Sequence, residues 1–402
     1  MRTHAVKTRA MRNHARLLLA GLALLLPASG ALAQASCGGD FGAWRNAVVE
    51  EARAAGVGQA GLNAIASAQN NPEVLKRDRA QGVFTLDFAT FARRLISQNR
   101  LDVGAAKLKQ YASTFDRARS EYGVAPEVIT AFWGLETDFG GYQGDFNTLN
   151  SIATLAHDCR RPELFRPQLI ALARLIDLGV VPRDITGAWA GEIGMVQVLP
   201  EDYLTKGRDG DGDGAIKLKT SAPDAIMTAA NFLQSLGWRA NEPWLIEVQV
   251  PAEMEWYDTG LHEALPVSEW KARGVTARNG DLPDNAATHL LIPMGRKGPA
   301  FLAYPNFNVF LEWNQSLTYV LTAAYFSTRL GGAPIFTEGN PEPGLNQAQM
   351  KQLQAKLNAD GFDVGEIDGI LGAGTRDAVR EEQRRLGMPA DAWPTATLLN
   401  AL

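Results

Sequence analysis

The stretch APEVITAFWGLETDFGG, residues 125–141, predicts a helix with an acidic side chain on an apolar face. Pro126 suits the first helical position, and the glycine pair that closes the stretch suits a helix stop. Ile129, Trp133 and Glu136 are spaced i, i+4 and i+7, so Glu136 shares its face with large apolar groups. Burial and the last-turn position both disfavour a charged carboxylate, which predicts a general acid with a raised pKa. A half-exposed glutamate without a catalytic role is the other interpretation.

The sequence around this helix divides into a helical part, a β-prone part and a small C-terminal part. Residues 40–237 space their apolar groups at three and four, and residues 244–310 contain short β-prone runs separated by Pro, Gly and Asn. A last helix over 314–330 precedes residues 331–344, whose Gly and Pro content predicts a linker. Residues 345–402 predict a compact module. The expected fold class is mainly α (α+β), with a small β-rich subdomain and a C-terminal three-helix module.

The first 33 residues predict a cleaved signal peptide that is not part of the fold. A basic start is followed by the apolar run LLLAGLALLLP and by a small-residue cleavage signal near Ala33. Because this run is short for a membrane span, we expect export to the periplasm of a bacterium. Removal of its five basic residues leaves 34 basic and 44 acidic residues, a net charge of −10. This charge argues against a nucleic-acid partner.

Two cysteines, Cys37 and Cys159, follow the signal peptide. An even number in an oxidising compartment favours one disulfide bond, which would tie the new N-terminus to the core. A lipid anchor on Cys37 is the alternative. Gln34 stands where a lipidation signal has Leu, and Cys37 lies ten positions after Pro27 at the end of the apolar run. These features favour the disulfide over lipidation.

The segment RDGDGDGAIKLKTSAPD, residues 208–224, begins with the spacing of an EF-hand calcium loop. Three Asp residues alternate, and a Gly occupies the sixth position as such a loop requires. Thr220 stands at the twelfth position, where a Glu is expected, and Asp224 substitutes if the loop bulges. Exposed Gly-Asp turns without metal, and helix capping by Asp224, are the alternatives. The candidate ligands of a structural Ca²⁺ are Asp209, Asp211, Asp213, Ala215 (through its carbonyl) and Asp224.

The segment AWAGEIGMVQVLPEDY, residues 188–203, is the better candidate for a polar partner of Glu136. Its closely spaced glycines allow the backbone to approach a ligand, and Glu192, Gln197 and Tyr203 lie near them in sequence. Because loops of this composition are common, the segment alone does not establish a site.

Four segments together resemble the B-type lytic murein transglycosylases, which are lysozyme-like enzymes of the bacterial periplasm. These segments are GLETDFGG, GEIGMVQVLPEDY, the acidic loop with the helix after it, and PNFNVFLEWNQS, in the order and spacing of that family. The resemblance implies a lysozyme-like catalytic domain over residues 36–330.

The motifs of the family imply roles for particular residues. Its catalytic E-T-x-x-G motif falls on Glu136, and its paired arginines match Arg160 and Arg161, which suit carboxylates of the peptide stem or lactyl group. The late motif departs from the family at Trp313, where Tyr is usual, and at Glu312, where a basic residue is frequent. The expected substrate contacts are Gln197, Arg160, Arg161, Tyr203, Glu192, Asn306, Asn308, Trp313 and Asn314.

The reaction implied by the resemblance needs one carboxyl group and no cofactor. Glu136 would protonate the oxygen that links MurNAc to GlcNAc, while the MurNAc acetamido oxygen stabilises the sugar carbon. The same residue, now ionised, would deprotonate the MurNAc 6-hydroxyl, which closes onto C1 as a 1,6-anhydro ring. The alternatives are a muramidase that delivers water through Glu192 as a second carboxylate, and a non-catalytic peptidoglycan-binding scaffold.

Residues 345–402 resemble the first type of peptidoglycan-binding domain, with matches that include Leu353, Asp368, Gly369 and Gln383. The resemblance implies that glycan strands of the wall are the partner, and a tethered module would raise the local substrate concentration. A structural cap on the preceding domain is the other interpretation, and the Gly-rich linker favours the tether. Proteins of cell-wall synthesis or assembly are further candidate partners.

Overall fold

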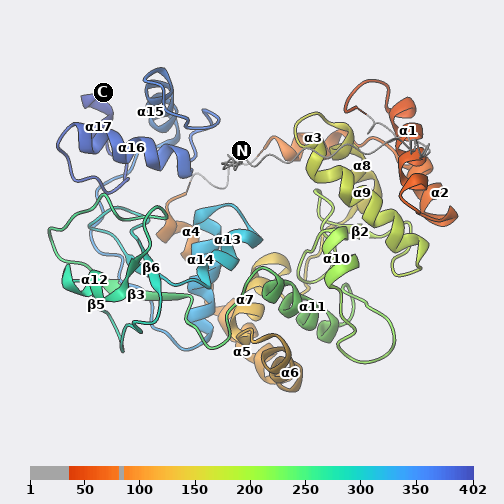
Figure 1. The fold of residues 1–402 in the computed structure, drawn as a ribbon, viewed down its shortest axis with the longest axis horizontal. Helices are drawn as coiled ribbons and strands as arrows, with labels where there is room; N and C mark the ends of the chain where they lie inside the picture. Colours follow the sequence, from red (N-terminus) through yellow and green to blue (C-terminus); the bar gives the residue numbers. More distant parts are fainter. Residues whose placement is uncertain (1–35, 81–85) are drawn as a thin grey trace, which may run out of the picture. The chain divides into compact units, whose positions relative to one another are not determined.

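The computed structural model describes residues 36–80 and 86–402, so the expected signal peptide, residues 1–33, lies outside the described residues. The helical part that the sequence predicts extends from α1 to α11, with one pair of short antiparallel strands (Figure 1). These elements are α1 (Phe41–Ala54), α2 (Gln59–Ser67), α3 (Pro72–Asp78), α4 (Phe88–Leu95), α5 (Gln98–Gln110), α6 (Ala112–Tyr122), α7 (Pro126–Thr137), β1 (Phe146–Asn147), α8 (Thr148–His157), α9 (Pro162–Asp177), β2 (Thr186–Gly187), α10 (Pro200–Lys206) and α11 (Ala222–Ser235).

Helix α7 is buried along most of its length because four other helices, α5, α6, α11 and α14, pack against it. Ile129 and Phe132 are fully buried, and each such side chain stabilises the fold by about 1.5–3 kcal/mol. The helix begins at Pro126, as the sequence predicts, but it ends at Thr137, before the glycine pair. Asp138 terminates it in the left-handed conformation at φ 51°, which Asp tolerates better than most residues.

The β-rich subdomain forms a five-stranded sheet in the order β4-β6-β7-β3-β5, and every neighbouring pair is antiparallel. It has a core of its own that includes the buried Trp256 and Trp270. The prediction of short β-prone runs within residues 244–310 is confirmed by strands β3, β6 and β7. The elements are β3 (Leu245–Gln249), β4 (Leu265–Pro266), α12 (Val267–Ala272), β5 (Thr276–Ala277), β6 (Ala287–Leu291) and β7 (Ala300–Ala303).

Two helices after the sheet return the chain to α7. They are α13 (Phe307–Trp313) and α14 (Leu317–Leu330), and α14 packs directly on α7. Ser316 caps α14 by accepting a hydrogen bond from the Tyr319 N–H, which sets the start of the helix three residues later than the sequence suggests. The connection between α13 and α14 therefore places Trp313 and Tyr319 next to the C-terminal end of α7.

The segment 331–344, predicted as a linker, packs on the β-rich subdomain in this structure. Phe336 is buried and contacts the rings of Phe88, Phe301 and Tyr325. The backbone N–H of Thr337 donates to a carboxylate oxygen of Glu247 at 2.7 Å. A few apolar and hydrogen-bonded residues suffice to fix a segment of otherwise linker-like composition.

The C-terminal module contains the predicted helices, α15 (Gln347–Ala359), α16 (Ala373–Arg385) and α17 (Ala396–Ala401), around a small core of their own. It also contacts the β-rich subdomain. A guanidinium N–H of Arg376 donates to the carbonyl of Pro293 at 2.9 Å, and His262 lies 2.6 Å from a carboxylate oxygen of Asp377. The C-terminal module therefore packs on the β-rich subdomain in this structure, as the alternative interpretation of a structural cap expects.

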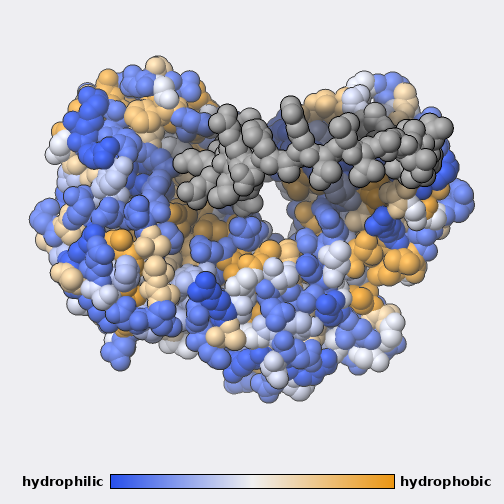
Figure 2. All heavy atoms as spheres, viewed as in Figure 1, coloured by the Kyte–Doolittle hydropathy of each residue, from blue (hydrophilic) through white to orange (hydrophobic). Residues whose placement is uncertain are grey.

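The described surface mixes polar and apolar residues, as Figure 2 shows for one face. The large apolar side chains that stay exposed are Tyr142, Leu164, Leu178, Ile335 and Ile367. Of the helices in residues 36–80 and 86–402, none has both the length and the apolar character that crossing a membrane requires.

Candidate active site

Glu136 lies in the last turn of α7, half-buried, and one of its carboxylate oxygens accepts two hydrogen bonds. The indole N–H of Trp313 donates to Oε1 at 3.1 Å, and the hydroxyl of Tyr319 donates to the same atom. Because an indole can only donate, Trp313 fixes Oε1 as an acceptor. A proton on this carboxyl group therefore resides on Oε2.

Aromatic packing holds Trp313 in the position from which it reaches Glu136. Its ring stacks on Phe132 with centroids 4.3 Å apart, and it contacts Phe232 of α11 at 5.2 Å. Phe132 lies one turn before Glu136 on α7, so the stack and the hydrogen bond come from the same helix. Aromatic pairs of this kind contribute about 0.5–1.5 kcal/mol beyond the area that they bury.

The pKa of Glu136 is raised to about 7, and burial is the main cause. The hydrogen bonds from Tyr319 and Trp313 act in the opposite direction, because they favour the ionised carboxylate. The negative charge of Glu192 raises the pKa further. Burial also raises the pKa of Tyr319 well above its usual value, so its hydroxyl keeps the proton that it donates. The balance leaves Glu136 able to release and to take up a proton near neutral pH.

The loop before α10 is linked to the end of α7. The hydroxyl of Thr137 donates to the carbonyl of Met195 at 2.6 Å, and Ile193 and Val198 form a short antiparallel bridge. The glycines of this loop are required by packing against protein: a Cβ on Gly191 would lie 2.3 Å from Ile152. Close packing against neighbouring protein groups therefore explains these glycines, without the ligand that the sequence suggested. Gln197 lies in the turn with φ 50° and donates to the carbonyl of Gly194 at 2.7 Å.

Glu192 lies in the same loop, half-buried and without a complete set of hydrogen bonds. Its Oε2 atom is closed off from solvent and has no hydrogen-bond partner in the described part of the chain. Burial raises the pKa of Glu192, while the positive charge of Arg161 lowers it. Glu192 is therefore close enough to interact electrostatically with both Arg161 and Glu136.

The paired arginines share a buried counter-ion that the sequence analysis did not identify. Arg160 contacts Asp78 at 2.7 Å, Arg161 contacts the other carboxylate oxygen of the same residue, and Asp78 is only 1% exposed. The guanidinium of Arg161 also lies 5.1 Å from the ring centre of Phe165. Both arginines stay more than one-third exposed, so each retains N–H groups for a further anion.

Two of the predicted substrate contacts serve the fold instead. The hydroxyl of Tyr203 is directed to the carbonyl of Ile216 at 2.7 Å, and this residue is 3% exposed. Asn306 is fully buried, and its amide bonds to the backbone of Arg239 and Glu242. Their polar groups are hydrogen-bonded inside the protein in this structure, and contact of Tyr203 or Asn306 with substrate stays an untested prediction.

The other two residues predicted from the late motif keep accessible side chains. Asn308 is exposed on α13, and Asn314 ends that helix half-buried. The side-chain oxygen of Asn314 accepts a hydrogen bond from the Ser316 N–H at 2.8 Å. Their contact with substrate stays a prediction.

The predicted disulfide between Cys37 and Cys159 is present, with the two Cα atoms 5.2 Å apart. Cys159 directly precedes the paired arginines. Two further interactions join the same segments: the Gly38 N–H donates to the His157 carbonyl at 2.8 Å, and the His157 ring lies 3.2 Å from the Gly39 carbonyl.

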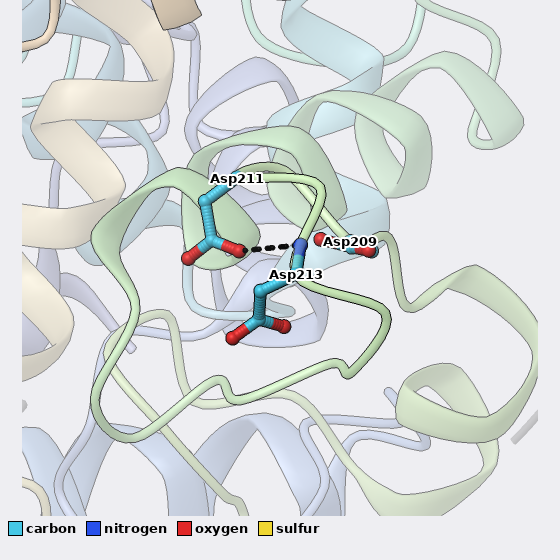
Figure 3. A group of neighbouring side chains, drawn as sticks. All are labelled: Asp209, Asp211 and Asp213. Carbon is cyan, nitrogen blue, oxygen red and sulfur yellow. Dashed lines mark hydrogen bonds between the residues drawn. The ribbon is translucent and has the colours of Figure 1, made fainter.

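The acidic loop brings Asp209, Asp211 and Asp213 together, with carboxylate oxygens within 4.8 Å of one another (Figure 3). Hard oxygen donors in this arrangement fit a calcium ion, so these three residues would hold it. Lys217 bonds to Asp213 and offers a positive charge at the same place.

Asp224 has a different position from the one predicted. It is fully buried, and its two oxygens accept hydrogen bonds from the N–H groups of Gly210 and Lys217, which joins the two ends of the loop. Asp224 is not among the three carboxylates that lie within 4.8 Å of one another, and its role as a metal ligand stays a prediction. The alternative capping role belongs instead to Ser221, which caps α11.

Comparison with known proteins assigns the family. A model described as "Transglycosylase SLT domain" matches residues 40–328, which is more than half of the chain. The chain belongs to this family. A peptidoglycan binding domain model matches residues 346–402, so the transglycosylase domain is followed by such a module.

Individual relatives agree with this assignment. SltB3 of Pseudomonas aeruginosa, solved in complex with NAG-anhNAM-pentapeptide, is 35% identical, with a TM-score of 0.82 over 90% of this chain and 99% of that one. The soluble lytic transglycosylase SltB1 of the same organism is 26% identical, with a TM-score of 0.63 over 72% and 99%. The membrane-bound lytic murein transglycosylase B of Escherichia coli (strain K12) is 28% identical over 58% of this chain and 64% of its own length. The match thus covers less than two thirds of that curated relative.

In this transglycosylase SLT domain, the residues around the acid come from segments that are far apart in sequence. Sequence reasoning located Glu136, Glu192, Trp313 and the arginine pair, but it missed Tyr319 and Asp78. Tyr319 lies six residues after Trp313, and that spacing is the one signal by which it could have been found, since both lie next to the predicted late motif. Asp78 lies in a stretch without any motif.

Proposed function

We propose that this chain is a lytic transglycosylase that cleaves the MurNAc-β-1,4-GlcNAc bond of peptidoglycan without using water. The observation that carries the proposal is the half-buried Glu136 carboxyl group, with a pKa of about 7 and both hydrogen bonds on one oxygen. A group with this pKa can serve as an acid and then as a base at neutral pH. The anhydro-sugar ligand of the SltB3 structure supports the same product class.

The proposed reaction uses Glu136 twice. Its protonated Oε2 gives a proton to the glycosidic oxygen, the bond from this oxygen to C1 of MurNAc breaks, and GlcNAc leaves with a hydroxyl group. The acetamido oxygen of MurNAc stabilises the electron-poor C1. The carboxylate then takes the proton of the 6-hydroxyl, whose oxygen bonds to C1 and forms the 1,6-anhydro ring. Trp313 and Tyr319 stabilise the carboxylate that exists between these two steps.

Mass spectrometry of the soluble products from purified peptidoglycan tests this proposal. Fragments that end in anhydro-MurNAc, lighter by one water than hydrolysis products, are the expected result. Reducing MurNAc ends would instead indicate the muramidase reaction, with Glu192 as the group that activates water. Binding to the wall without any release of fragments would indicate the scaffold.

The remaining parts of the chain fit a cell-wall enzyme. Arg160 and Arg161 keep N–H groups available beyond Asp78, and these would bind carboxylates of the peptide stem or lactyl group. The C-terminal module would bind glycan strands while docked on the β-rich subdomain. Periplasmic location follows from the expected signal peptide and agrees with the disulfide.

Replacement of Trp313 by Phe is expected to shift the alkaline limb of the pH–rate profile upward. The indole N–H favours the ionised form of Glu136, so its loss raises the pKa of this residue above about 7. The protonated acid that starts the reaction then persists to higher pH. We expect a shift of about 0.5–1 pH unit in kcat/KM for fragment release. Tyr319→Phe should shift the limb in the same direction, and a limb that stays in place or moves down in both variants would contradict the assigned hydrogen bonds.

We also propose that the acidic loop binds a structural Ca²⁺ through Asp209, Asp211 and Asp213. The alternating carboxylates and their mutual distances support this ion, and the chain's own loop closure by Asp224 gives the site a fixed frame. The ion would stabilise the loop and take no part in bond cleavage. Whether the carbonyl of Ala215 joins the site stays a prediction.

Calcium is therefore expected to raise the thermal unfolding temperature. At a concentration one hundred times the dissociation constant, binding to the folded state stabilises it by about 2.7 kcal/mol. The measurement is differential scanning calorimetry with Ca²⁺ and with a chelator. Asp211→Asn should abolish the difference, whereas Asp116→Asn, on the exposed surface of α6, should retain it. Equal unfolding temperatures with and without calcium in the unaltered protein would rule the site out.

A further inference from the structure

A small cavity lies between the C-terminal module and the rest of the chain. Its volume is about 30 Å³, which admits one water-sized group and excludes a sugar or a phosphate group. Apolar side chains, including Leu317 and Leu321 of α14, form one side of it. The module forms the other side and contributes the charged residues Arg376, Arg380 and Asp391. The cavity thus places charged groups against a wall of low polarity.

The two arginines of this cavity have donor atoms without an acceptor. The Nε atoms of Arg376 and Arg380 are closed off from solvent, and neither has a hydrogen-bond partner in the described part of the chain. Arg380 as a whole is only 5% exposed. Another N–H group of Arg376 donates to the Pro293 carbonyl at 2.9 Å, and one of Arg380 reaches Asp377 at 3.5 Å. Because a buried donor without an acceptor destabilises a protein, the pair calls for an acceptor from outside the chain.

The carboxylates nearby are bonded to other groups. Asp391 accepts three hydrogen bonds, all from uncharged amide N–H groups. Asp377 lies 2.6 Å from His262, and Glu381 accepts a hydrogen bond from the Tyr257 hydroxyl. Asp377 and Glu381 line the larger neighbouring pocket and not the cavity itself. Among the described residues that line the cavity, two therefore carry a positive charge and one carries a negative charge.

Packing holds the two guanidinium groups in place. The arginines are spaced i, i+4 on α16, so they share one face of that helix. A Cβ on Gly260 would lie 2.5 Å from Nη2 of Arg380, so this guanidinium packs directly on the backbone of the β-rich subdomain. The pKa of Arg376 is lowered to about 10, because burial and the positive charge of Arg380 disfavour its charged form. Two like charges are thus held close together at this interface.

We propose that the cavity binds one chloride ion, which accepts hydrogen bonds from the guanidinium groups of Arg376 and Arg380. Water is also an acceptor of the right size, but it has no charge to offset the second arginine. The apolar wall strengthens the attraction between ion and arginines, because it lowers the local dielectric constant. Both arginines contact the β-rich subdomain, so an ion that neutralises them stabilises the docked module.

Bromide, which replaces chloride and scatters X-rays anomalously, tests the site directly. Crystals of the chain without its signal peptide are grown in sodium bromide. The expected result is an anomalous peak between the guanidinium groups of Arg376 and Arg380. Density without an anomalous signal at that place would identify a water molecule and overturn the proposal. An empty cavity would overturn it as well.

Thermal unfolding tests the effect of the ion on the folded chain. Calorimetry compares sodium chloride with sodium gluconate at equal ionic strength, because gluconate is too large for the cavity. At a chloride concentration ten times the dissociation constant, we expect unfolding about 2 °C higher than in gluconate. Equal unfolding temperatures in the two salts would overturn the proposal.

Variants of α16 assign the salt effect to the cavity. Arg380→Met should abolish the difference between chloride and gluconate, and Arg376→Met should do the same if the first variant does not fold. Arg385→Met removes an exposed arginine of the same helix and should retain the difference. A difference that persists without Arg380 or Arg376 would place the ion elsewhere and overturn the proposal.

Discussion

Glu136→Gln is expected to lower the release of anhydro-MurNAc fragments by at least about a thousandfold, because one residue serves as acid and then as base. Glutamine keeps the size of the side chain and the acceptor for Trp313 and Tyr319, so the aromatic packing should persist. The rate is measured as fragment release from purified peptidoglycan, followed by mass spectrometry.

Glu136→Gln should lose activity, but it should not lose stability. The folded-state pKa of Glu136 is raised, so the glutamate's contribution to stability is present below its ordinary pKa and is lost as the pH rises through about 7. Glutamine has no charge to bury, and the variant should therefore be at least as stable as the parent above that pH.

A matched control for both measurements is Glu127→Gln, at the other end of α7 and weakly paired with Arg119 at 4.0 Å. Residual activity within tenfold of the parent would reject Glu136 as the catalytic group.

The sequence predicts the acid better than its surroundings, for a physical reason. Glu136 is visible because helical periodicity places it on an apolar face, which depends only on residues within the same helix. Its hydrogen-bond donors come from 177 and 183 residues further along the chain, and no local pattern reports such a contact. Asp78 is hidden for the same reason, since its partners follow it by 82 and 83 residues.

Several candidate site residues have polar groups that the fold already uses. Tyr203 and Asn306 are polar residues within motifs, and both are hydrogen-bonded to backbone groups in the core. Asp224 follows the acidic loop in sequence, and it accepts two backbone N–H groups. A sequence shows that a polar side chain is present but not whether the fold already uses it. Glu192 is the opposite case, because its Oε2 atom has no hydrogen-bond partner within residues 36–80 and 86–402.

Removal of the disulfide is expected to cause the largest loss of stability in the catalytic domain. The bond joins residues separated by 122 positions, and in the chain-entropy model a loop of this length stabilises a protein by about 4–5 kcal/mol. The change is the double replacement Cys37→Ala and Cys159→Ala, which avoids a free thiol. The entropy of unfolding is about 2.1 cal/mol/K per residue, so 1 kcal/mol shifts the unfolding temperature of a domain of about 295 residues by about 1.6 °C. A decrease of about 6–8 °C should therefore be measurable by calorimetry.

Contacts next to the disulfide should keep the arginine pair in place when the bond is removed. The hydrogen bonds from Gly38 to His157 and from His157 to Gly39 remain, and Asp78 still holds Arg160 and Arg161. We therefore expect the rate of fragment release at 25 °C to stay within about threefold of the parent while the unfolding temperature decreases. Reductant should destabilise the parent and leave the double variant unchanged. If the double variant unfolds at the temperature of the parent, the bond merely fastens the N-terminal end, and the long loop that it closes contributes nothing to the stability of the domain.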